Sequence, residues 1–228
     1  KKDLVKSKNL KALVTTGPTK EYLDPVRFIS NESSGKQGYE VAIALKRLGI
    51  KTKLIAGPSK LVSSKDLKIK KIVSAKEMMN EVKKSLPVDI AICAAAVADY
   101  KPITKSKNKI KKNFSNLNII KLEKNPDILD YLSKNNKNRP KIVVGFSAET
   151  ENIIQNSKIK IKDKYCDLII ANDISKKDSG FNSDYNKVSI IDKNGKVKSI
   201  PKNKKSYIAN IIAKIILDKL LMNDKNIN

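Results

Sequence analysis

Histidine and tryptophan are absent from this 228-residue chain, and cysteine occurs only twice. Without an imidazole, the chain cannot build a Ser–His or Cys–His catalytic pair, and it lacks the commonest ligand of transition metals. Cys93 and Cys166 stand alone in apolar stretches, with no CxxC pair, so we expect buried thiols in a reducing compartment. A transition-metal site is therefore not expected, whereas a Mg²⁺ ion held by oxygen atoms is compatible with this composition.

The chain also lacks any apolar run long enough to cross a bilayer, and no signal peptide precedes its first predicted strand. We therefore expect a cytoplasmic protein without a membrane partner. Hydrophobic residues make up 40% of the chain, which is enough for a sizeable core. Because the chain starts at Lys1 rather than Met and residues 1–9 are mostly polar, we expect a linker there, within a longer polypeptide.

Arginine and aromatic residues are scarce, although the formal net charge is +25. Such a charge attracts nucleic acid. Yet arginine, the usual reader of bases, occurs only at Arg27, Arg47 and Arg139, and aromatic residues make up 5% of the chain. Lysine is spread over nearly every segment together with Asn and Ile, the pattern that a biased nucleotide composition of the genome produces. We expect no specific nucleic-acid partner, and a basic RNA-binding module is the alternative from another functional class.

Strand-like and helix-like stretches alternate along the chain. Apolar runs predict strands at 10–16, 51–57, 67–73, the first part of 89–100, 141–150 and 167–173, and helical spacing predicts helices at 38–48, 75–86, from about 151, and 206–221. Asn194-Gly195, between the runs 188–192 and 197–200, indicates a β-hairpin. We predict one α/β domain over residues 10–221, a three-layer, Rossmann-like, mainly parallel sheet with an appended hairpin, and a frayed tail at 222–228.

A polar loop joins the first predicted strand to the first predicted helix. A helix start presents unpaired N–H groups and a partial positive charge, so small residues there let a phosphate approach the backbone. The loop residues that we expect to contact phosphate are Ser33, Ser34, Gly35, Lys36 and Gly38. The loop matches neither GxGxxG, which argues against a Rossmann-type oxidoreductase, nor a Walker A loop. By these general rules a plain surface loop is an equal alternative.

Further polar residues stand where strands end or helices begin. Asp99 follows the strand within 89–100, at the edge where open parallel sheets bind ligands, although a turn residue is an equal alternative. The tripeptide from Asn125 to Asp127 predicts a helix start with Asn125 as the N-cap and a proline in the first turn. Lys160 and Lys164 lie one helical turn apart, so both can reach one anion or both can face solvent.

A lysine-rich segment and a phenylalanine can each be interpreted in two ways. Lys101–Lys112 is rich in lysine with little apolar periodicity, so it is either a solvated loop or a lid whose mobile cations close over a triphosphate. Phe146, near the end of its strand, suits either a core or a ligand. The last predicted helix carries one apolar stripe: Tyr207, Ile208, Ile211, Ile212, Ile215 and Ile216.

Several stretches occur in the order typical of one enzyme family. They are LDPVRFISNESSGKQG (23–38), AAVADY (95–100), the KxKK element at 109–112, NPDI (125–128), GFSAET (145–150), the pair Lys160 and Lys164, and GFNSD (180–184). The resemblance that they carry covers essentially residues 10–221. The chain resembles phosphopantothenate–cysteine ligase, also called phosphopantothenoylcysteine synthetase. The similarity is to the bacterial CTP-dependent type, which forms the C-terminal half of a bifunctional protein of coenzyme A biosynthesis.

The resemblance implies roles for individual residues. Nucleotide contacts are implied for Ala95, Ala96, Asp99, Lys109, Asn125, Pro126, Asp127, Ile128, Phe146, Lys160 and Lys164. Phe146 is expected against the base, and Lys109, on a lid, beside the triphosphate and the charge that develops there. The resemblance also implies that Asn31 hydrogen-bonds the acyl-cytidylate and promotes the second step. Arg27 is a further catalytic candidate, for the phosphate or the carboxylate of the substrate.

The implied reaction joins 4′-phosphopantothenate to L-cysteine. The carboxylate is first activated as an acyl-cytidylate at the expense of CTP and Mg²⁺, and the cysteine amine then displaces CMP. An ATP-using version is the alternative within the family. Family membership also implies a homodimer, and FMN only where an N-terminal decarboxylase domain is present.

Overall fold

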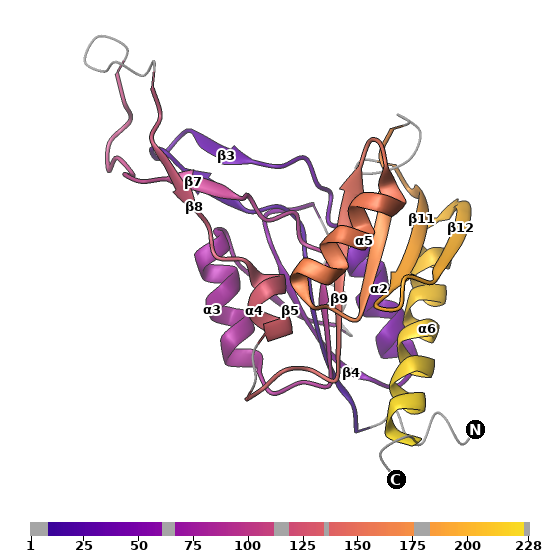
Figure 1. Cartoon of the computed structure of the whole chain (residues 1–228). Helices are drawn as coiled ribbons and strands as arrows, with labels where there is room; N and C mark the ends of the chain where they lie inside the picture. The colour runs from indigo at the N-terminus through magenta and orange to yellow at the C-terminus, as the bar shows by residue number, and fades with distance from the viewer. Residues whose placement is uncertain (1–8, 61–66, 112–118, 135–136, 176–182, 226–228) are drawn as a thin grey trace.

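The computed structural model describes residues 9–60, 67–111, 119–134, 137–175 and 183–225 (Figure 1), so nearly all of the predicted linker lies outside the described residues. The main sheet consists of β1 (Lys11–Thr16), β4 (Lys51–Ala56), β5 (Lys68–Lys71), β6 (Ile90–Cys93), β9 (Ile142–Glu149), β10 (Leu168–Asp173), β11 (Tyr185–Asp192) and β12 (Val197–Lys204). The helices are α2 (Lys36–Arg47), α3 (Ala75–Ser85), α4 (Ile128–Lys134), α5 (Ile153–Lys164) and α6 (Lys205–Lys225).

The strand order places a ligand crevice at one edge of the sheet. The order is β12-β11-β10-β9-β6-β1-β4-β5. The six strands from β10 to β5 run parallel, and β11 pairs antiparallel with both β10 and β12. From β1 the chain builds outward to β4 and β5, then crosses back to β6 on the other side of β1. The order therefore reverses between β1 and β6, and in such sheets ligands bind beyond the carboxyl ends of the strands at this point.

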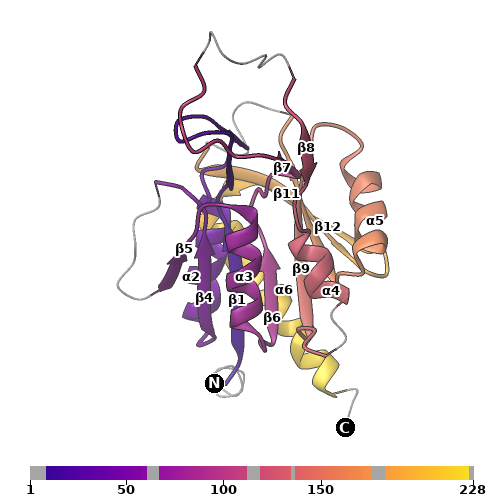
Figure 2. The same cartoon turned by 90° about the vertical axis from the view of Figure 1, so that its left-hand side faces the viewer.

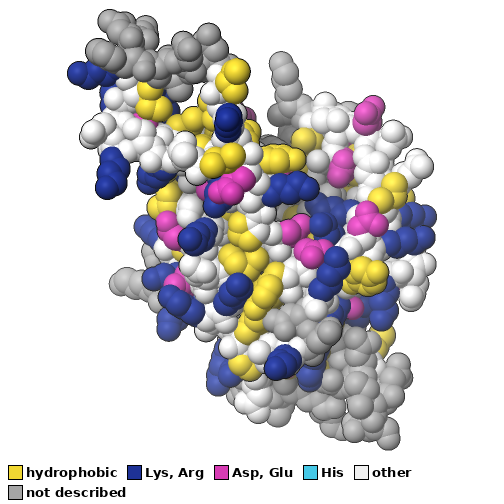
Figure 3. All heavy atoms as spheres, turned by 60° about the vertical axis from the view of Figure 1, so that its left-hand side comes forward, with side chains coloured by type: hydrophobic (Ala, Val, Ile, Leu, Met, Phe, Trp, Pro, Cys, Tyr) yellow, Lys and Arg dark blue, Asp and Glu magenta, His cyan; other side chains and the backbone are white. Residues whose placement is uncertain are grey.

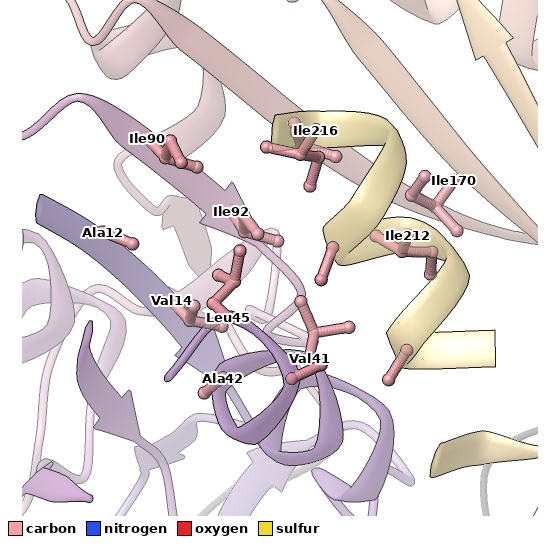
Figure 4. Close-up of a cluster of buried hydrophobic side chains, with 14 of the residues drawn as sticks. Ala12, Val14, Val41, Ala42, Leu45, Ile90, Ile92, Ile170, Ile212 and Ile216 are labelled. Carbon is pink, nitrogen blue, oxygen red and sulfur yellow. The ribbon is translucent and has the colours of Figure 1, made fainter. Parts of the chain in front are cut away.

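The helices cover both faces of the sheet, which confirms the predicted three-layer fold (Figures 1 and 2). Side chains alternate between the two cores, as a strand requires. Val14 packs under α2 and α6, whereas its neighbour Leu13 packs on the face of α3, α4 and α5. Figure 4 shows Leu45 of α2 beside Ile92 of β6, with Ile212 of α6 in the same first core. No helix of the described chain is both long and apolar enough to span a membrane.

Some element boundaries differ from the prediction. α6 continues to Lys225, past the predicted end at residue 221, and Tyr207 is 52% exposed, so its place on the buried stripe was wrong. Of the other predicted stripe residues, Ile208, Ile212 and Ile216 are buried, and Ile211 and Ile215 are partly buried. The helix also buries Ala209, Ala213, Leu217 and Leu220. The hairpin at Asn194-Gly195 is confirmed, and Gly195 has a φ of 81°, which an L-residue rarely adopts.

Two small antiparallel sheets were not predicted. β2 (Lys20–Tyr22) pairs with β3 (Phe28–Ser30), and β7 (Tyr100–Pro102) pairs with β8 (Leu122–Lys124). β2 lies against β7, and both sheets project beyond the carboxyl edge of the main sheet (Figure 1). Each strand has only three residues, which is too short for an alternating pattern to be recognised in the sequence.

Candidate nucleotide-binding site

A cavity of about 540 Å³ lies beyond the carboxyl ends of β1, β6, β9 and β10, at the crevice that the strand order predicts. Its wall includes all the residues predicted to contact nucleotide except Lys109: Ala95, Ala96, Asp99, Asn125, Pro126, Asp127, Ile128, Phe146, Lys160 and Lys164. These residues come from four separate segments of the chain. We call this space the main cavity.

The wall segment before α4 corrects the predicted helix cap. α4 begins at Ile128, and the carboxylate of Asp127 accepts the N–H of Asp130 at 2.9 Å, so Asp127 is the N-cap. Asn125 instead donates from Nδ2 to the carbonyl of Ala98 at 2.8 Å. The Oδ1 atom of Asn125 is buried and has no hydrogen-bond partner among the described residues. A buried acceptor of this kind suits a donor group of a bound ligand.

The two lysines of α5 both line the main cavity. Lys160 donates from Nζ to the carbonyl oxygen of Phe146 at 3.0 Å, and Lys164 donates to Oδ2 of Asp127 at 2.7 Å. The hydrogen bond that Lys164 donates to Asp127 raises the pKa of Lys164 despite partial burial. Burial would raise the pKa of Asp127, but the N–H of Asp130 and the Lys164 charge outweigh it and lower that pKa. Both partners are therefore ionised at neutral pH.

A second, smaller hollow of about 40 Å³ adjoins the main cavity. All five residues predicted to contact phosphate line it, and it shares Ala94, Phe146 and Asn172 with the main cavity. We call it the loop hollow. Gly35, with a φ of 72°, precedes α2, and its carbonyl accepts the hydroxyl of Thr16 at 2.6 Å.

The loop is held close to the end of β1. A Cβ at Gly38 would lie 2.4 Å from Oγ1 of Thr16, so the helix can approach the strand this closely only with glycine at that position. Lys36 pairs with Asp184, with Nζ 2.6 Å from Oδ1, and this hydrogen bond lowers the pKa of the carboxyl group.

Three predicted catalytic residues do not line either space. Asn31 lies beside the main cavity, where its Nδ2 approaches the carbonyl oxygens of Ala96 at 3.3 Å and Val97 at 3.2 Å. Lys109 is exposed, on the segment that follows β7. Lys112 of the KxKK element and residues 180–182 of GFNSD lie outside the described residues.

Arg27 is held by contacts within the protein, although its side chain is 41% exposed. Its guanidinium contacts Asp24, with Nε 3.0 Å from Oδ2, and it donates to the carbonyl of Ile110. Asp24 is fully buried and also accepts the N–H groups of Val26, Arg27 and Ile110. Burial raises the pKa of Asp24, but these donors and the Arg27 charge outweigh it and bring that pKa to about 2. The cluster ties the residue after Lys109 to the β2–β3 hairpin.

The sequence reading missed Lys205. It is the first residue of α6, is only 5% exposed and lines the loop hollow. A signal was present, because a lysine at a helix N-terminus faces the positive end of the helix dipole and is unfavourable there without another reason.

Metal ligands and reactive thiols are scarce in this region. Among the described residues, no three Cys, Asp or Glu side chains lie close enough to hold a metal ion. Mg²⁺ commonly binds through substrate phosphates with few protein carboxylates, and the exposed Asp99 is the main-cavity carboxylate without an assigned capping role. Burial raises the pKa of Cys93 and of Cys166 to about 12, so both remain thiols.

A reversed strand order, a glycine loop opening a helix and lysines around the adjoining cavity define a Rossmann-like α/β protein with a candidate anion site at its crevice. The family model of the DNA/pantothenate metabolism flavoprotein C-terminal domain matches residues 7–220, and the chain belongs to this family.

Sequence comparison with curated proteins finds relatives that are about twice as long as the region of this chain that they match. The chain is 43% identical over 211 residues to the coenzyme A biosynthesis bifunctional protein CoaBC of Borreliella burgdorferi, covering 92% of this chain and 53% of that protein. It is 39% identical over 217 residues to CoaBC of Escherichia coli K12, covering 94% and 52%. The chain thus spans about half the length of the curated relatives it matches.

Solved structures share the fold. The crystal structure of the C-terminal domain of a CoaBC protein superposes with a TM-score of 0.78 at 33% identity, covering 93% of this chain and 96% of that chain. A Cab2 variant in complex with phosphopantothenate-cysteine has a TM-score of 0.74 at 17% identity, with 98% and 92% coverage, a likeness of fold alone.

Proposed function

We propose that this chain is a ligase that joins 4′-phosphopantothenate to L-cysteine at the expense of CTP. One observation carries the proposal: the family motifs at 95–99, 125–128 and 146 and the lysine pair of α5 all converge on one cavity at the crevice of the sheet. The family membership and the CoaBC relatives support the same reaction. The chain spans about half of those relatives, and FMN is expected only where an N-terminal decarboxylase domain is present.

The chemistry explains why such a site needs cations rather than a nucleophilic side chain. A carboxylate resists attack by an amine because the leaving group would be an oxide. A carboxylate oxygen of phosphopantothenate therefore attacks the α-phosphorus of CTP, and the bond to the bridging β-phosphate oxygen breaks, releasing pyrophosphate. The cysteine amine then attacks the acyl carbon, the bond to CMP breaks, and the amine loses a proton.

The residues of the chain act by holding anions in position. Lys160 and Lys164 are placed to contact the nucleotide phosphates, and Lys164 exchanges its bond to Asp127 for a phosphate oxygen. The ring of Phe146, which lines the main cavity, contacts the nucleotide base. Asn31 sits against the loop that follows β6, where its amide can donate to a substrate oxygen once it leaves the carbonyls of Ala96 and Val97.

Lys109 is proposed to act from outside the cavity. Its side chain is exposed, and the next residue, Ile110, is bound by the Asp24–Arg27 cluster. This anchor leaves the Lys109 ammonium free to approach a triphosphate from above the crevice. Mg²⁺ would arrive with the nucleotide and offset charge on its phosphates. In this arrangement Arg27 is a positioning residue rather than a catalytic one.

Isotope transfer tests the reaction. The chain is incubated with Mg²⁺, L-cysteine and phosphopantothenate carrying ¹⁸O in both carboxylate oxygens, with CTP or ATP in parallel. We expect pyrophosphate release, one ¹⁸O in CMP and the other in the amide product, with CTP preferred. Label in inorganic phosphate would show an acyl phosphate instead, and absence of amide product with either nucleotide would refute the proposed ligase.

The proposed function also concerns the oligomeric state and the distribution of charge on the surface. We expect a homodimer, which sedimentation at micromolar concentration measures directly. On the face shown in Figure 3, basic side chains lie at many separate places with acidic ones among them, rather than in one stripe. Such a face gives no support to the RNA-binding alternative.

A further inference from the structure

Thr19 is a fully buried polar residue that lines neither the main cavity nor the loop hollow. It follows β1 and lies outside every family stretch identified in the sequence. Its hydroxyl, N–H and carbonyl groups each form a hydrogen bond to a segment that carries a predicted site residue. A buried residue with this set of bonds can fix the distance between those segments.

Two of these bonds hold the loop that follows β6, residues 94–99. The Thr19 hydroxyl accepts the N–H of Ala98 at 3.1 Å, and the Thr19 N–H donates to the carbonyl of Ala96 at 3.3 Å. A parallel bridge between Pro18 and Ala96 continues the same contact. The loop therefore takes its position from the segment that follows β1.

The third bond reaches the hairpin that carries Asn31. The Thr19 carbonyl accepts the hydroxyl of Ser30 at 2.7 Å, and Ser30 is the last residue of β3. Lys20, the residue after Thr19, pairs with Ser30 in the β2–β3 sheet. The backbone position from which the Asn31 side chain starts is therefore tied to Thr19.

The Asn31 side chain contacts the same loop that Thr19 holds. Its Nδ2 lies 3.3 Å from the carbonyl oxygen of Ala96 and 3.2 Å from that of Val97. The Ala96 carbonyl thus accepts from both Thr19 and Asn31, one donor for each of its two lone pairs. Because Ala96 also lines the main cavity, a shift of the loop would change the distance between the Asn31 amide and a ligand in that cavity.

We infer that Thr19 is a positioning residue that acts through Asn31 in the second step of the reaction. The inference rests on the proposed function, in which Asn31 acts when the cysteine amine attacks the acyl carbon. In that step a C–N bond forms, the C–O bond to the CMP phosphate breaks, and the amine releases a proton.

The remaining wall of the main cavity is independent of Thr19. The segment 125–129 and the lysines of α5 make no hydrogen bond to Thr19 in the part of the chain that the structure describes. These groups are proposed to hold the nucleotide during the first step. Loss of the Thr19 hydroxyl should therefore slow the second step more than the first.

The test compares Thr19→Val with Thr19→Ser and Thr52→Val. Valine keeps the shape of threonine but leaves the Ala98 N–H without its acceptor, whereas serine keeps the hydroxyl. Thr52, near the amino end of β4 and away from the main cavity, controls for the same chemical change. Rapid mixing with CTP, Mg²⁺, 4′-phosphopantothenate and L-cysteine, followed by quenching, measures pyrophosphate, acyl-cytidylate and amide product in the same samples.

Thr19→Val should form amide about 10- to 100-fold more slowly than wild type, because a displacement of about 1 Å in a positioning group costs on the order of 100-fold in rate. Its first release of pyrophosphate should stay close to the wild-type rate, so acyl-cytidylate should accumulate. Thr19→Ser and Thr52→Val should complete both steps at close to the wild-type rate. Amide formation at the wild-type rate by Thr19→Val, or an equal fall in both steps, as loss of folded protein would cause, overturns the inference.

A second measurement needs no turnover. The side-chain amide resonance of Asn31, identified as the one missing from Asn31→Asp, is recorded on the ¹⁵N-labelled chain without substrates. It should shift in Thr19→Val and not in Thr52→Val, and an unchanged resonance overturns the inference. A wild-type chain that makes neither pyrophosphate nor amide refutes the ligase, and the resonance then decides on its own whether Thr19 positions Asn31. If Thr19→Val does not fold, Ser30→Ala, which removes the hydroxyl bound to the Thr19 carbonyl, replaces it in both measurements with the same expected results.

Discussion

Substituting Gly38 by alanine tests whether the phosphate loop depends on close contact between α2 and β1. Gly38 lies in the first turn of α2, and an added Cβ would sit 2.4 Å from Oγ1 and 2.8 Å from Cβ of Thr16. Both distances are far inside van der Waals contact. Thr16 belongs to the central strand β1 and is fully buried, so the relief must come from movement of the loop and the helix start.

The expected magnitude follows from three opposing contributions. Alanine is favoured over glycine inside a helix by about 1 kcal/mol. Overpacking of this kind costs about 1–3 kcal/mol, and displacement of the hydrogen bond from Thr16 to the Gly35 carbonyl costs about 1 kcal/mol more. We therefore expect Gly38→Ala to lower the free energy of unfolding by roughly 1–3 kcal/mol, a fall in Tm of roughly 2–12 °C for a domain of this size.

The rate of the reaction should be affected more strongly than the free energy of unfolding, because the loop forms one wall of the site. A shift of about 1 Å in a positioning group can cost on the order of 100-fold in rate. Gly195→Ala is the matched control: it has a φ of 81° but nothing within 4 Å of the new Cβ. That variant should lose about 1 kcal/mol through backbone strain and keep full activity. A Gly38→Ala chain that is more stable than wild type and fully active would refute the close-contact argument.

Three further predictions concern charged residues of the site and its supports. Lys160→Met and Lys164→Met should each raise the KM for CTP about tenfold, while Lys162→Met on the exposed face of α5 should not; equal effects at all three positions would contradict the lysine-pair assignment. Asp127→Ala should cost about 1 kcal/mol by removing the α4 cap, and Asp127→Asn, which can still cap, should cost less in thermal melts. The pKa of Asp24 falls from 3.8 to about 2 on folding. Its contribution to stability is therefore complete above pH 4 and is lost as the pH falls toward 2. Asp24→Asn should flatten the pH dependence of Tm in that range, and an unchanged pH profile of Tm would contradict this prediction.

The central sheet could be predicted because its patterns are local. β1, β4 and β10 are apolar runs bounded by turn residues, and α2 repeats its apolar side chains at helical spacing. The main cavity also followed from the sequence, because the resemblance ordered its segments and strand ends gather at one edge of a parallel sheet. All the predicted nucleotide contacts except Lys109 lie there.

The remaining features depend on tertiary contacts that no local pattern encodes. Asn125 and Asp127 are both good caps, and Asp127 prevails because Asn125 is bound to Ala98 across the site. The bonds of Arg27 to Asp24 and Ile110 also join separate segments, and no local pattern predicts them. The burial of Lys205 also depends on the packing of α6 beside α2, which brings Gln37 and Lys205, 168 positions apart, into hydrogen-bond contact.

A crystal structure of the chain with CTP and 4′-phosphopantothenate tests the account most directly. We expect the base against Phe146, the nucleotide phosphates within hydrogen-bond distance of Lys160 and Lys164, and a phosphoryl group against the loop Ser33–Gly38. CTP bound away from the main cavity, with those lysines still paired to Phe146 and Asp127, would contradict it.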